Sequence, residues 1–420
     1  MADEDDGFRF RPIADGAAPG SLRPPGRTAD NASDARLLRL RTNVRAPRAR
    51  CDCGEPLWRP IEPLERWPSG TGSSGRSIWR YDAVLPASQP AGDLEAGGAS
   101  IWRSRSLEGY AGARVWLVDE GRNPTGSFKD RGSAVGVAAA LEAGVVRVGT
   151  VSHGNMARSV AAHAAAVGID CTVLVPADIA EERIRAIARF DPQIVRVRGD
   201  YGRLYYDALE LGRRHGIQFL NSDVPLRVAG QKTLAFDLLE RIPDLDAIVL
   251  PVSSGGNASA VWKGLLELRA GGLLESLPRL YLTQAAACDP IAAAFRSGRE
   301  RVDPAADVKA TVAYSIANAD PPSGTRALAA VRDTDGAVLS VDDDATLEAQ
   351  DRLARDAGVR VEPASATTLA GLRRLTERGE IDTDETVACV LTGRGYGGGG
   401  DVPTTPVVDQ EDLESVLESA

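Results

Sequence analysis

The sequence predicts an α/β protein in which parallel sheets carry helices on both faces. Short apolar runs alternate along the chain with longer segments of helical pattern, and turns rich in Gly, Asn and Ser separate them. The hydrophobic content of 43% and the charged content of 26% are ordinary for a globular protein. Because alternating strands and helices wind into a parallel sheet, the expected fold is doubly wound. In such sheets ligands bind at the carboxyl ends of the strands.

The alternation begins at residue 114. A strand at 114–118 leads through an Asn-Pro-Thr-Gly turn into a helix from Ser127 to about Ala143. Gly168 and Pro176 interrupt regular structure and so end a helix and a strand further along. Up to residue 220, the other strands are expected at 145–151, 171–175, 194–198 and 218–220. The other helices are expected at 156–167, between Pro176 and about Phe190, and at 201–215.

The same alternation resumes after residue 230. The segment 362–366 is either one further helix start, with a Pro in its first turn, or a wall of the ligand pocket. The expected elements are a helix at 233–241, a strand at 247–252, a turn at 253–257 that opens another helix, and strands at 279–284, 337–341 and 386–391.

The two ends of the chain lack this pattern. Residues 1–40 are polar, with scattered Pro, Gly and Asp, and are expected to form a disordered or loosely attached arm. Residues 401–420 contain six acids and no Lys or Arg, so we expect an acidic tail that is solvated or forms a frayed helix.

Charge and hydropathy exclude several classes of function. The net charge of −10 disfavours a nucleic-acid-binding surface. The longest apolar runs are interrupted by charge or glycine before they reach the length of a membrane span. The chain opens with acidic residues and not with a basic and then apolar signal, so a cytoplasmic protein without a membrane partner is expected.

Two of the five cysteines, Cys51 and Cys53, resemble half of a zinc ribbon. A structural zinc site needs four ligands, but no Cys or His precedes Cys51 and no His follows before His153. We therefore expect a ribbon-like remnant without metal. The remaining cysteines lie in apolar stretches and are expected as buried small hydrophobic residues.

Lys129 is the strongest candidate for catalysis. Only four of the 49 basic residues are lysines, yet one of them stands in the segment Asn-Pro-Thr-Gly-Ser-Phe-Lys-Asp-Arg-Gly. Arginine fills most surface roles, but it is too basic to act as an amine nucleophile. A primary amine forms a Schiff base with a carbonyl, so Lys129 indicates covalent chemistry.

Three more candidate sites follow strands. The turn at 253–257 could bind a phosphate, because its glycines let backbone N–H groups approach an anion at a helix N-terminus. A tight strand-to-helix turn without a ligand accounts for the same glycines equally well. Asn155 is either a ligand-binding amide or a helix N-cap. Thr392 either presents its hydroxyl to a ring nitrogen or is an exposed turn residue. The turn consists of Ser253, Ser254, Gly255, Gly256 and Asn257.

Together these motifs resemble the threonine synthase family, pyridoxal-phosphate enzymes of the tryptophan-synthase-β type (fold type II). The segment from Asn123 to Gly132 is similar to the Schiff-base lysine segment of that family nearly letter for letter. Gly-Gln-Lys-Thr at 230–233, Glu-Pro-Ala-Ser-Ala at 362–366 and the Leu-Thr-Gly strand end resemble the family in the same order. The resemblance covers about residues 50–400.

The resemblance implies a cofactor, pyridoxal 5'-phosphate, and a role for each motif. Lys129 would form the Schiff base and later act as the acid–base amine. Asn155 would bond the ring hydroxyl oxygen, the 253–257 turn would hold the phosphate and Thr392 would meet the ring nitrogen. Arg227 falls where the family places a substrate-phosphate arginine, although a surface arginine is the competing interpretation. The expected substrate-binding residues are Ser127, Ser152, His153 and Arg227.

The resemblance also implies an architecture and a reaction. We expect two doubly wound parallel-sheet domains with the cofactor cleft between them, and possibly a homodimer. The expected segments are a ribbon remnant with the start of the large domain at 41–121, a smaller α/β domain at 122–224 and the large α/β domain at 225–400. The implied enzyme is a carbon–oxygen lyase that converts O-phospho-L-homoserine and water to L-threonine and phosphate.

Several positions depart from the family pattern, and they leave alternatives open. His153 replaces a small hydroxyl residue, Ser253 and Ser254 replace Gly-Asn, Ala229 replaces a Glu and Arg394 replaces a His. One alternative is a paralogous dehydratase or β-replacement enzyme that acts on threonine, serine or phosphoserine. A second is a non-catalytic ligand-binding protein on the same fold. A nucleotide-binding module is disfavoured, because no Gly-x-Gly-x-x-Gly follows the first strand.

Overall fold

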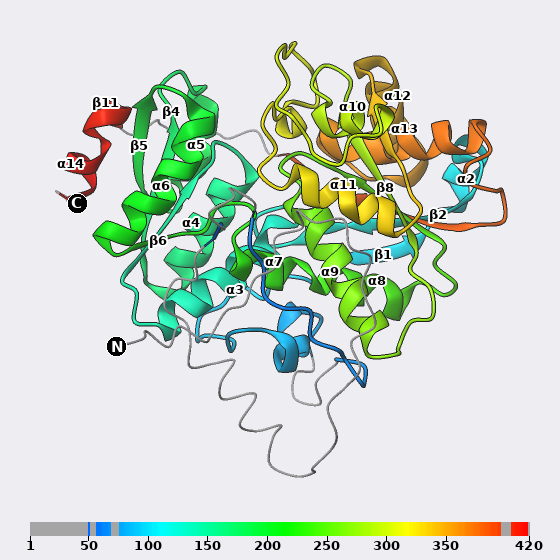
Figure 1. Ribbon diagram of the computed structural model, residues 1–420, viewed down its shortest axis with the longest axis horizontal. Coiled ribbons are helices and arrows are strands. Elements are labelled where there is room, and N and C mark those ends of the chain that lie inside the picture. Colours follow the sequence, from blue (N-terminus) through cyan, green and yellow to red (C-terminus); the bar gives the residue numbers. More distant parts are fainter. Residues whose placement is uncertain (1–48, 51–55, 69–74, 396–404, 419–420) are drawn as a thin grey trace, which may run out of the picture.

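The computed structural model describes residues 49–50, 56–68, 75–395 and 405–418. The arm expected at 1–40, together with Cys51 and Cys53, lies outside these residues. The α/β class is confirmed: two parallel sheets form the centres of two lobes that lie side by side (Figure 1). Each strand expected between 114 and 391 is present, with ends that differ by no more than two residues.

Within the described ranges, the larger sheet has the strand order β1-β2-β10-β7-β8-β9. Its strands run parallel except for β1, which is antiparallel to β2. The central strands β7 and β10 are buried along their whole length, because helices cover both faces. The strands are β1 (Ser100–Arg103), β2 (Arg114–Asp119), β7 (Ala247–Pro251), β8 (Arg279–Ala285), β9 (Val338–Val341) and β10 (Thr386–Leu391).

Each face of the larger sheet has its own hydrophobic core. One core includes residues of α8, α9, α10 and α11, and the other includes residues of α2, α12 and α13. The helices are α2 (Arg105–Ala111), α8 (Thr233–Arg241), α9 (Gly256–Ala270), α10 (Pro290–Arg296), α11 (Gly324–Asp333), α12 (Asp343–Ala357) and α13 (Pro363–Glu377).

The smaller sheet is parallel, with the order β11-β5-β4-β3-β6. Helices α3, α4 and α5 pack on one face, and α6 and α14 pack on the other. The elements are β3 (Arg147–Val151), β4 (Asp170–Pro176), β5 (Gln193–Arg198), β6 (Ile217–Phe219), β11 (Val407–Asp409), α3 (Lys129–Glu142), α4 (Asn155–Val167), α5 (Glu181–Ala188), α6 (Tyr201–His215) and α14 (Leu413–Glu418).

The segment expected as an acidic tail is part of the fold where it is described. Val407–Asp409 adds β11 to the smaller sheet beside β5, and α14 buries Leu413 and Leu417 against that lobe. The two leucines are four residues apart, so they share one helix face, and Glu414 between them pairs with Arg214 and His215 of α6. The other short elements are η1 (Ile78–Val84), η2 (Glu120–Arg122), α7 (Pro225–Gln231), η3 (Tyr314–Ile316) and η4 (Gln410–Asp412).

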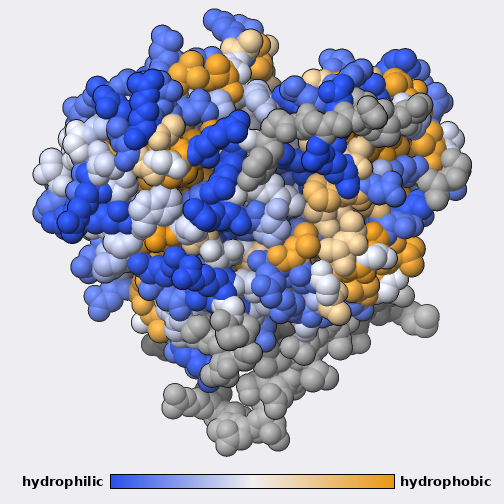
Figure 2. Space-filling model, turned by 180° about the vertical axis from the view of Figure 1, so that it is seen from behind, coloured by the Kyte–Doolittle hydropathy of each residue, from blue (hydrophilic) through white to orange (hydrophobic). Residues whose placement is uncertain are grey.

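The surface seen from behind in Figure 2 is mainly hydrophilic, with apolar residues in separate patches. Across the described part of the chain, every helix is too short or too polar to cross a lipid bilayer.

Candidate active site

The loop before α3 places Lys129 at the first position of that helix. The loop is held by Asp130, whose carboxylate accepts hydrogen bonds from the Thr125 backbone N–H (2.7 Å) and hydroxyl (2.6 Å). Gly126 takes a positive φ of 84°, which favours glycine and lets the chain turn toward the helix. Local hydrogen bonding therefore fixes the backbone that carries the lysine.

The Lys129 amine is electrostatically unusual. The pKa of Lys129 is lowered from 10.5 to about 7, chiefly because burial desolvates the amine and secondarily because of the charge of Arg227, while Glu362 opposes the shift. Lys129 forms no ion pair with any described residue, and its Nζ lies 4.5 Å from the centre of the Phe128 ring. A large share of the amine is thus unprotonated near neutral pH, as a nucleophile requires.

Two other lysines contrast with Lys129. Lys232 and Lys263 are buried, and both ammonium groups pair with Glu267 at 2.6 Å. The two ammonium groups share this one carboxylate, so both lysines are held in ion pairs between α8 and α9.

Arg227 lies beneath Lys129. It is fully buried on α7, and its guanidinium donates to the Ser133 hydroxyl (2.7 Å) and to the Lys129 backbone carbonyl (3.1 Å). Burial lowers the pKa of Arg227 to about 10. Both hydrogen bonds of Arg227 therefore go to the helix that begins at Lys129.

The end of β10 lies against the lysine loop. The Phe128 N–H donates to the Thr392 carbonyl (3.0 Å), and the Arg394 N–H donates to the Gly126 carbonyl (3.1 Å). Thr392 is 5% exposed, and its hydroxyl lies 3.2 Å from the Ser365 hydroxyl. The structure thus brings Lys129 and Thr392 together from sequence positions that are far apart.

Asn155 lies at the start of α4, close to the same strand end. Its Nδ2 donates to both carboxylate oxygens of Glu362 (3.0 and 3.1 Å). A Cβ added at Gly393 would lie 3.1 Å from Glu362 Oε1, 3.2 Å from Asn155 Nδ2 and 3.2 Å from Ser127 Cβ. Four segments therefore converge at Gly393. Sequence reasoning did not assign Glu362 a role, because its contact to Asn155 spans 207 positions.

Burial gives Glu362 a raised pKa, while the hydrogen bond from Asn155 opposes the shift. The hydroxyl of Ser127 is also buried here and has no hydrogen-bond partner among the described residues. Ser152 caps its own turn by accepting a hydrogen bond from the Gly154 N–H (3.3 Å).

The 253–257 turn connects β7 to α9. Gly255 has a φ of +85°, and a Cβ there would lie 2.3 Å from the Ser323 carbonyl oxygen. A Cβ at Gly256 would lie 2.7 Å from the Ser222 carbonyl oxygen. Asn257 is buried, and neither polar atom of its amide has a partner within the described ranges. A buried amide without partners beside a helix N-terminus fits an anionic ligand.

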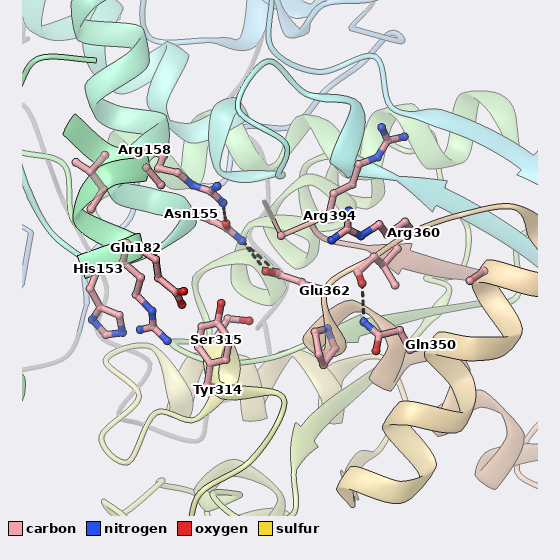
Figure 3. Close-up of a pocket in the computed structure, with 18 of the residues that line it drawn as sticks. His153, Asn155, Arg158, Glu182, Tyr314, Ser315, Gln350, Arg360, Glu362 and Arg394 are labelled. Atoms are coloured by element: carbon pink, nitrogen blue, oxygen red, sulfur yellow. Dashed lines mark hydrogen bonds between the residues drawn. The ribbon is translucent and has the colours of Figure 1, made fainter. Parts of the chain in front are cut away.

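A cavity of about 480 Å³ adjoins Asn155 and Glu362 between the two lobes (Figure 3). His153 lies on its wall with its ring centre 5.2 Å from that of Tyr201. Burial, and secondarily the charge of Arg183, lowers the pKa of His153 to about 4, so this side chain is neutral at pH 7. Lys129, Arg227, Thr392 and the 253–257 turn do not line this cavity.

The cavity contains Arg158, for which the sequence predicted no role, and Arg394, which the sequence showed as a departure from the family pattern. Arg158 follows Asn155 by three positions on α4 and therefore faces the same side of the helix. Arg394 also lines the cavity and pairs with Asp119 at 2.7 Å. The charged residues of the lining are Arg158, Glu182, Arg183, Asp351, Arg360, Glu362 and Arg394.

Several known proteins are similar to this chain in sequence. The family model described as "Pyridoxal-phosphate dependent enzyme" matches residues 93–393. The threonine synthase of Methanocaldococcus jannaschii is 37% identical over 326 residues, which cover 76% of this chain and 80% of that protein. The threonine synthase of Mycobacterium tuberculosis is 37% identical over 321 residues, which cover 73% of this chain and 85% of that protein.

Solved structures share the fold at lower identity. The processed form of threonine deaminase isoform 2 from Solanum lycopersicum has a TM-score of 0.63 at 20% identity, covering 86% of this chain and 98% of that one. Maize serine racemase has a TM-score of 0.60 at 22% identity, covering 76% and 92%. With these matches, the chain belongs to the pyridoxal-phosphate-dependent enzymes and, among them, to the threonine synthase family.

Proposed function

We propose that this protein is a threonine synthase, which converts O-phospho-L-homoserine and water to L-threonine and phosphate. The main support for this proposal is the environment of Lys129, which has a lowered pKa and lies at the start of α3 beside the end of β10. The name of the relatives at 37% identity supports the choice of reaction. A cytoplasmic location, which the sequence predicts, and a homodimer, which the family resemblance implies, belong to the same proposal.

The residues around Lys129 fit pyridoxal phosphate, the cofactor of this family. The amide of Asn257 and the hydroxyl of Ser127 are buried without partners in the described chain, and the Gly255 turn leaves no space for a side chain. In the proposed site the 253–257 turn holds the phosphate, and Asn155 and Thr392 contact the ring. When bound, the cofactor supplies a ring that stabilises negative charge on substrate carbons.

Lys129 performs the proton transfers in this proposal. A pKa of about 7 lets Nζ accept and release a proton at neutral pH with little cost. Glu362 and Asn155 hold the wall of the site beside it through their paired hydrogen bonds. The two lobes enclose the site and limit access of water.

The test is turnover by the holoenzyme. We expect L-threonine and inorganic phosphate in equal amounts from O-phospho-L-homoserine, and no comparable turnover of O-phospho-L-serine, L-serine or L-threonine. Lys129→Ala should abolish product and the visible absorbance of the bound cofactor, while the exposed Lys309→Ala should retain both. Turnover of serine or threonine without activity on phosphohomoserine would instead support the dehydratase alternative.

A further inference from the structure

Asp223 is a buried carboxylate outside the set of residues assigned to the proposed reaction. It lies in the segment that connects β6 of the smaller sheet to α7, and it is only 2% exposed. Its Oδ2 accepts hydrogen bonds from the Arg50 guanidinium (2.7 Å) and the Ser323 hydroxyl (3.0 Å), and its Oδ1 accepts one from the Tyr205 hydroxyl. Burying a carboxylate is costly, so these three donors and the carboxylate hold one another in place.

Ser323 binds Asp223 at the expense of a local role. It immediately precedes α11, where a serine hydroxyl usually accepts a hydrogen bond from an N–H of the first helical turn, but Ser323 makes no such bond. Its hydroxyl instead donates to Asp223 and accepts from Arg326 (3.1 Å). Arg50 strengthens this arrangement, since it donates both to Asp223 and to the carbonyl of Pro322 (3.0 Å). The start of α11 is therefore fixed to Asp223.

The backbone of Ser323 contacts the 253–257 turn through both of its polar groups. Its N–H donates to the Ser254 carbonyl (2.8 Å). Its carbonyl oxygen would lie 2.3 Å from a Cβ at Gly255, the residue of the turn with positive φ. A shift of Ser323 would therefore move the turn that leads into α9.

The residue before Asp223 packs against the same turn. A Cβ at Gly256 would lie 2.7 Å from the Ser222 carbonyl oxygen and 3.7 Å from the Cα of Asp223. The Ser222 hydroxyl lies 3.1 Å from that of Tyr205, which comes from α6 of the smaller lobe (Figure 1). Burial, and then the charge of Asp223, raises the pKa of Tyr205, so its phenol stays protonated and remains a donor. Asp223 thus ties the turn of the larger lobe to a helix of the smaller lobe.

We propose that Asp223 is a positioning residue, which sets the geometry of the 253–257 turn through the Ser323 hydroxyl and thereby the affinity of that turn for the cofactor phosphate. The inference rests on the proposed function, since it requires the turn to bind phosphate. Free N–H groups at a helix N-terminus bind an anion well only when they point at it together, so a small rotation of the turn costs affinity. The carboxylate acts through Ser323 and not by contact with the phosphate, because like charges repel.

The test compares two ligands that differ only in the phosphate. Pyridoxal phosphate and pyridoxal are titrated into the cofactor-free full chain, and visible absorbance gives the dissociation constant of each. Asp223→Asn removes the charge that holds Ser323, and Ser323→Ala removes the hydroxyl. Each should reduce the preference for pyridoxal phosphate roughly 10-fold with pyridoxal affinity retained, as expected for a lost charged hydrogen bond. The double variant should lose no more than Asp223→Asn alone, because both changes break the same link.

Asp333→Asn is the matched control. Asp333 lies at the opposite end of α11 and accepts hydrogen bonds from Trp262 (2.8 Å) and Arg269 (3.1 Å) of α9, so this change also weakens a charged contact between the two helices. It should keep the preference for pyridoxal phosphate. Phosphorus NMR of the bound cofactor gives a second readout: the phosphate signal should move in Asp223→Asn and in Ser323→Ala, and stay in place in Asp333→Asn.

The outcomes separate this inference from the proposed function. An equal loss of affinity for both ligands in Asp223→Asn, with an unmoved phosphorus signal, would indicate general structural damage and overturn the assignment. A preserved preference in Asp223→Asn, or additive losses in the double variant, would overturn it too. Where Asp223→Asn fails to fold, the smaller change Ser323→Ala decides alone, and a preference kept there defeats the inference. A wild type that binds pyridoxal as tightly as pyridoxal phosphate would instead defeat the phosphate site of the proposed function itself.

Discussion

At the scale of the residue, the environment of each lysine decides its role. Lys232 and Lys263 share Glu267, while Lys129 has an arginine beneath its backbone and no acidic partner in ion-pair contact within the described residues. The same side chain is therefore a structural cation in one place, and we propose it as an amine nucleophile in the other.

The lowered pKa of Lys129 predicts how cofactor incorporation depends on pH. An amine attacks only when unprotonated, so the rate at which cofactor-free protein gains visible absorbance with pyridoxal phosphate should rise through pH 7 and level off above pH 8. Stopped-flow absorbance between pH 5.5 and 10.5 measures this rate. A rate that keeps increasing up to pH 10 would show that the amine has the pKa of an ordinary exposed lysine.

At the scale of the element, the N-terminus of α9 depends on the turn before it. The positive φ of Gly255 and its approach to the Ser323 carbonyl place the free N–H groups of α9 at the edge of the sheet. Asn257, without partners in the described chain, stands on the first turn of that helix. In the proposed function, the turn and the helix act as one unit that binds the cofactor phosphate.

Gly255→Ala tests this unit. The new Cβ would lie 2.3 Å from a backbone oxygen in a strained conformation, so we expect loss of about 2–4 kcal/mol of stability and a weaker affinity for pyridoxal phosphate. Gly272→Ala is the control: it has a φ of +79° but no atom near the new Cβ, so it should cost about 1–2 kcal/mol and leave the affinity intact. Urea unfolding and absorbance titration measure both quantities. Normal affinity in Gly255→Ala would disprove the role of the turn.

At the scale of the whole molecule, the end of β10 and the segment that follows it both connect the two lobes. The lysine loop of the smaller lobe bonds to the end of β10 in the larger lobe, which closes the site. After β10 the chain returns to the smaller lobe, where β11 and α14 lie at its outer edge (Figure 1). The C-terminal segment thus stabilises the lobe that carries α4 and α5.

Leu413→Ala should loosen this segment. Leu413 is fully buried against the smaller lobe, so removing its side chain should lower the opening free energy of residues 407–418 by about 2–4 kcal/mol. Native-state hydrogen exchange measures this opening. Leu347→Ala, at an exposed leucine of α12, should leave the exchange unchanged. Unaltered protection in Leu413→Ala would mean that the leucine contributes little to docking.

Sequence reasoning anticipated the strands and the turns after them because both depend on neighbouring residues. Apolar runs predicted β7 and β10, and the Gly-rich turn predicted the start of α9. It did not anticipate β1, β11 or the helices α2, α7, α10, α11 and α12. The short strands β1 and β11 become regular only through pairing with residues distant in the chain.

By itself, the sequence determined the α/β class, the lysine segment and the strand-end location of the candidate residues, since periodicity and turn chemistry are local. Only the tertiary structure decided which of these residues meet. It placed Glu362 on Asn155 and Thr392 beside the lysine loop, and it buried Arg227 under Lys129 while leaving Arg158 toward the cavity. The physical reason is that burial and distance set the charge of a group, and both depend on how the two lobes pack.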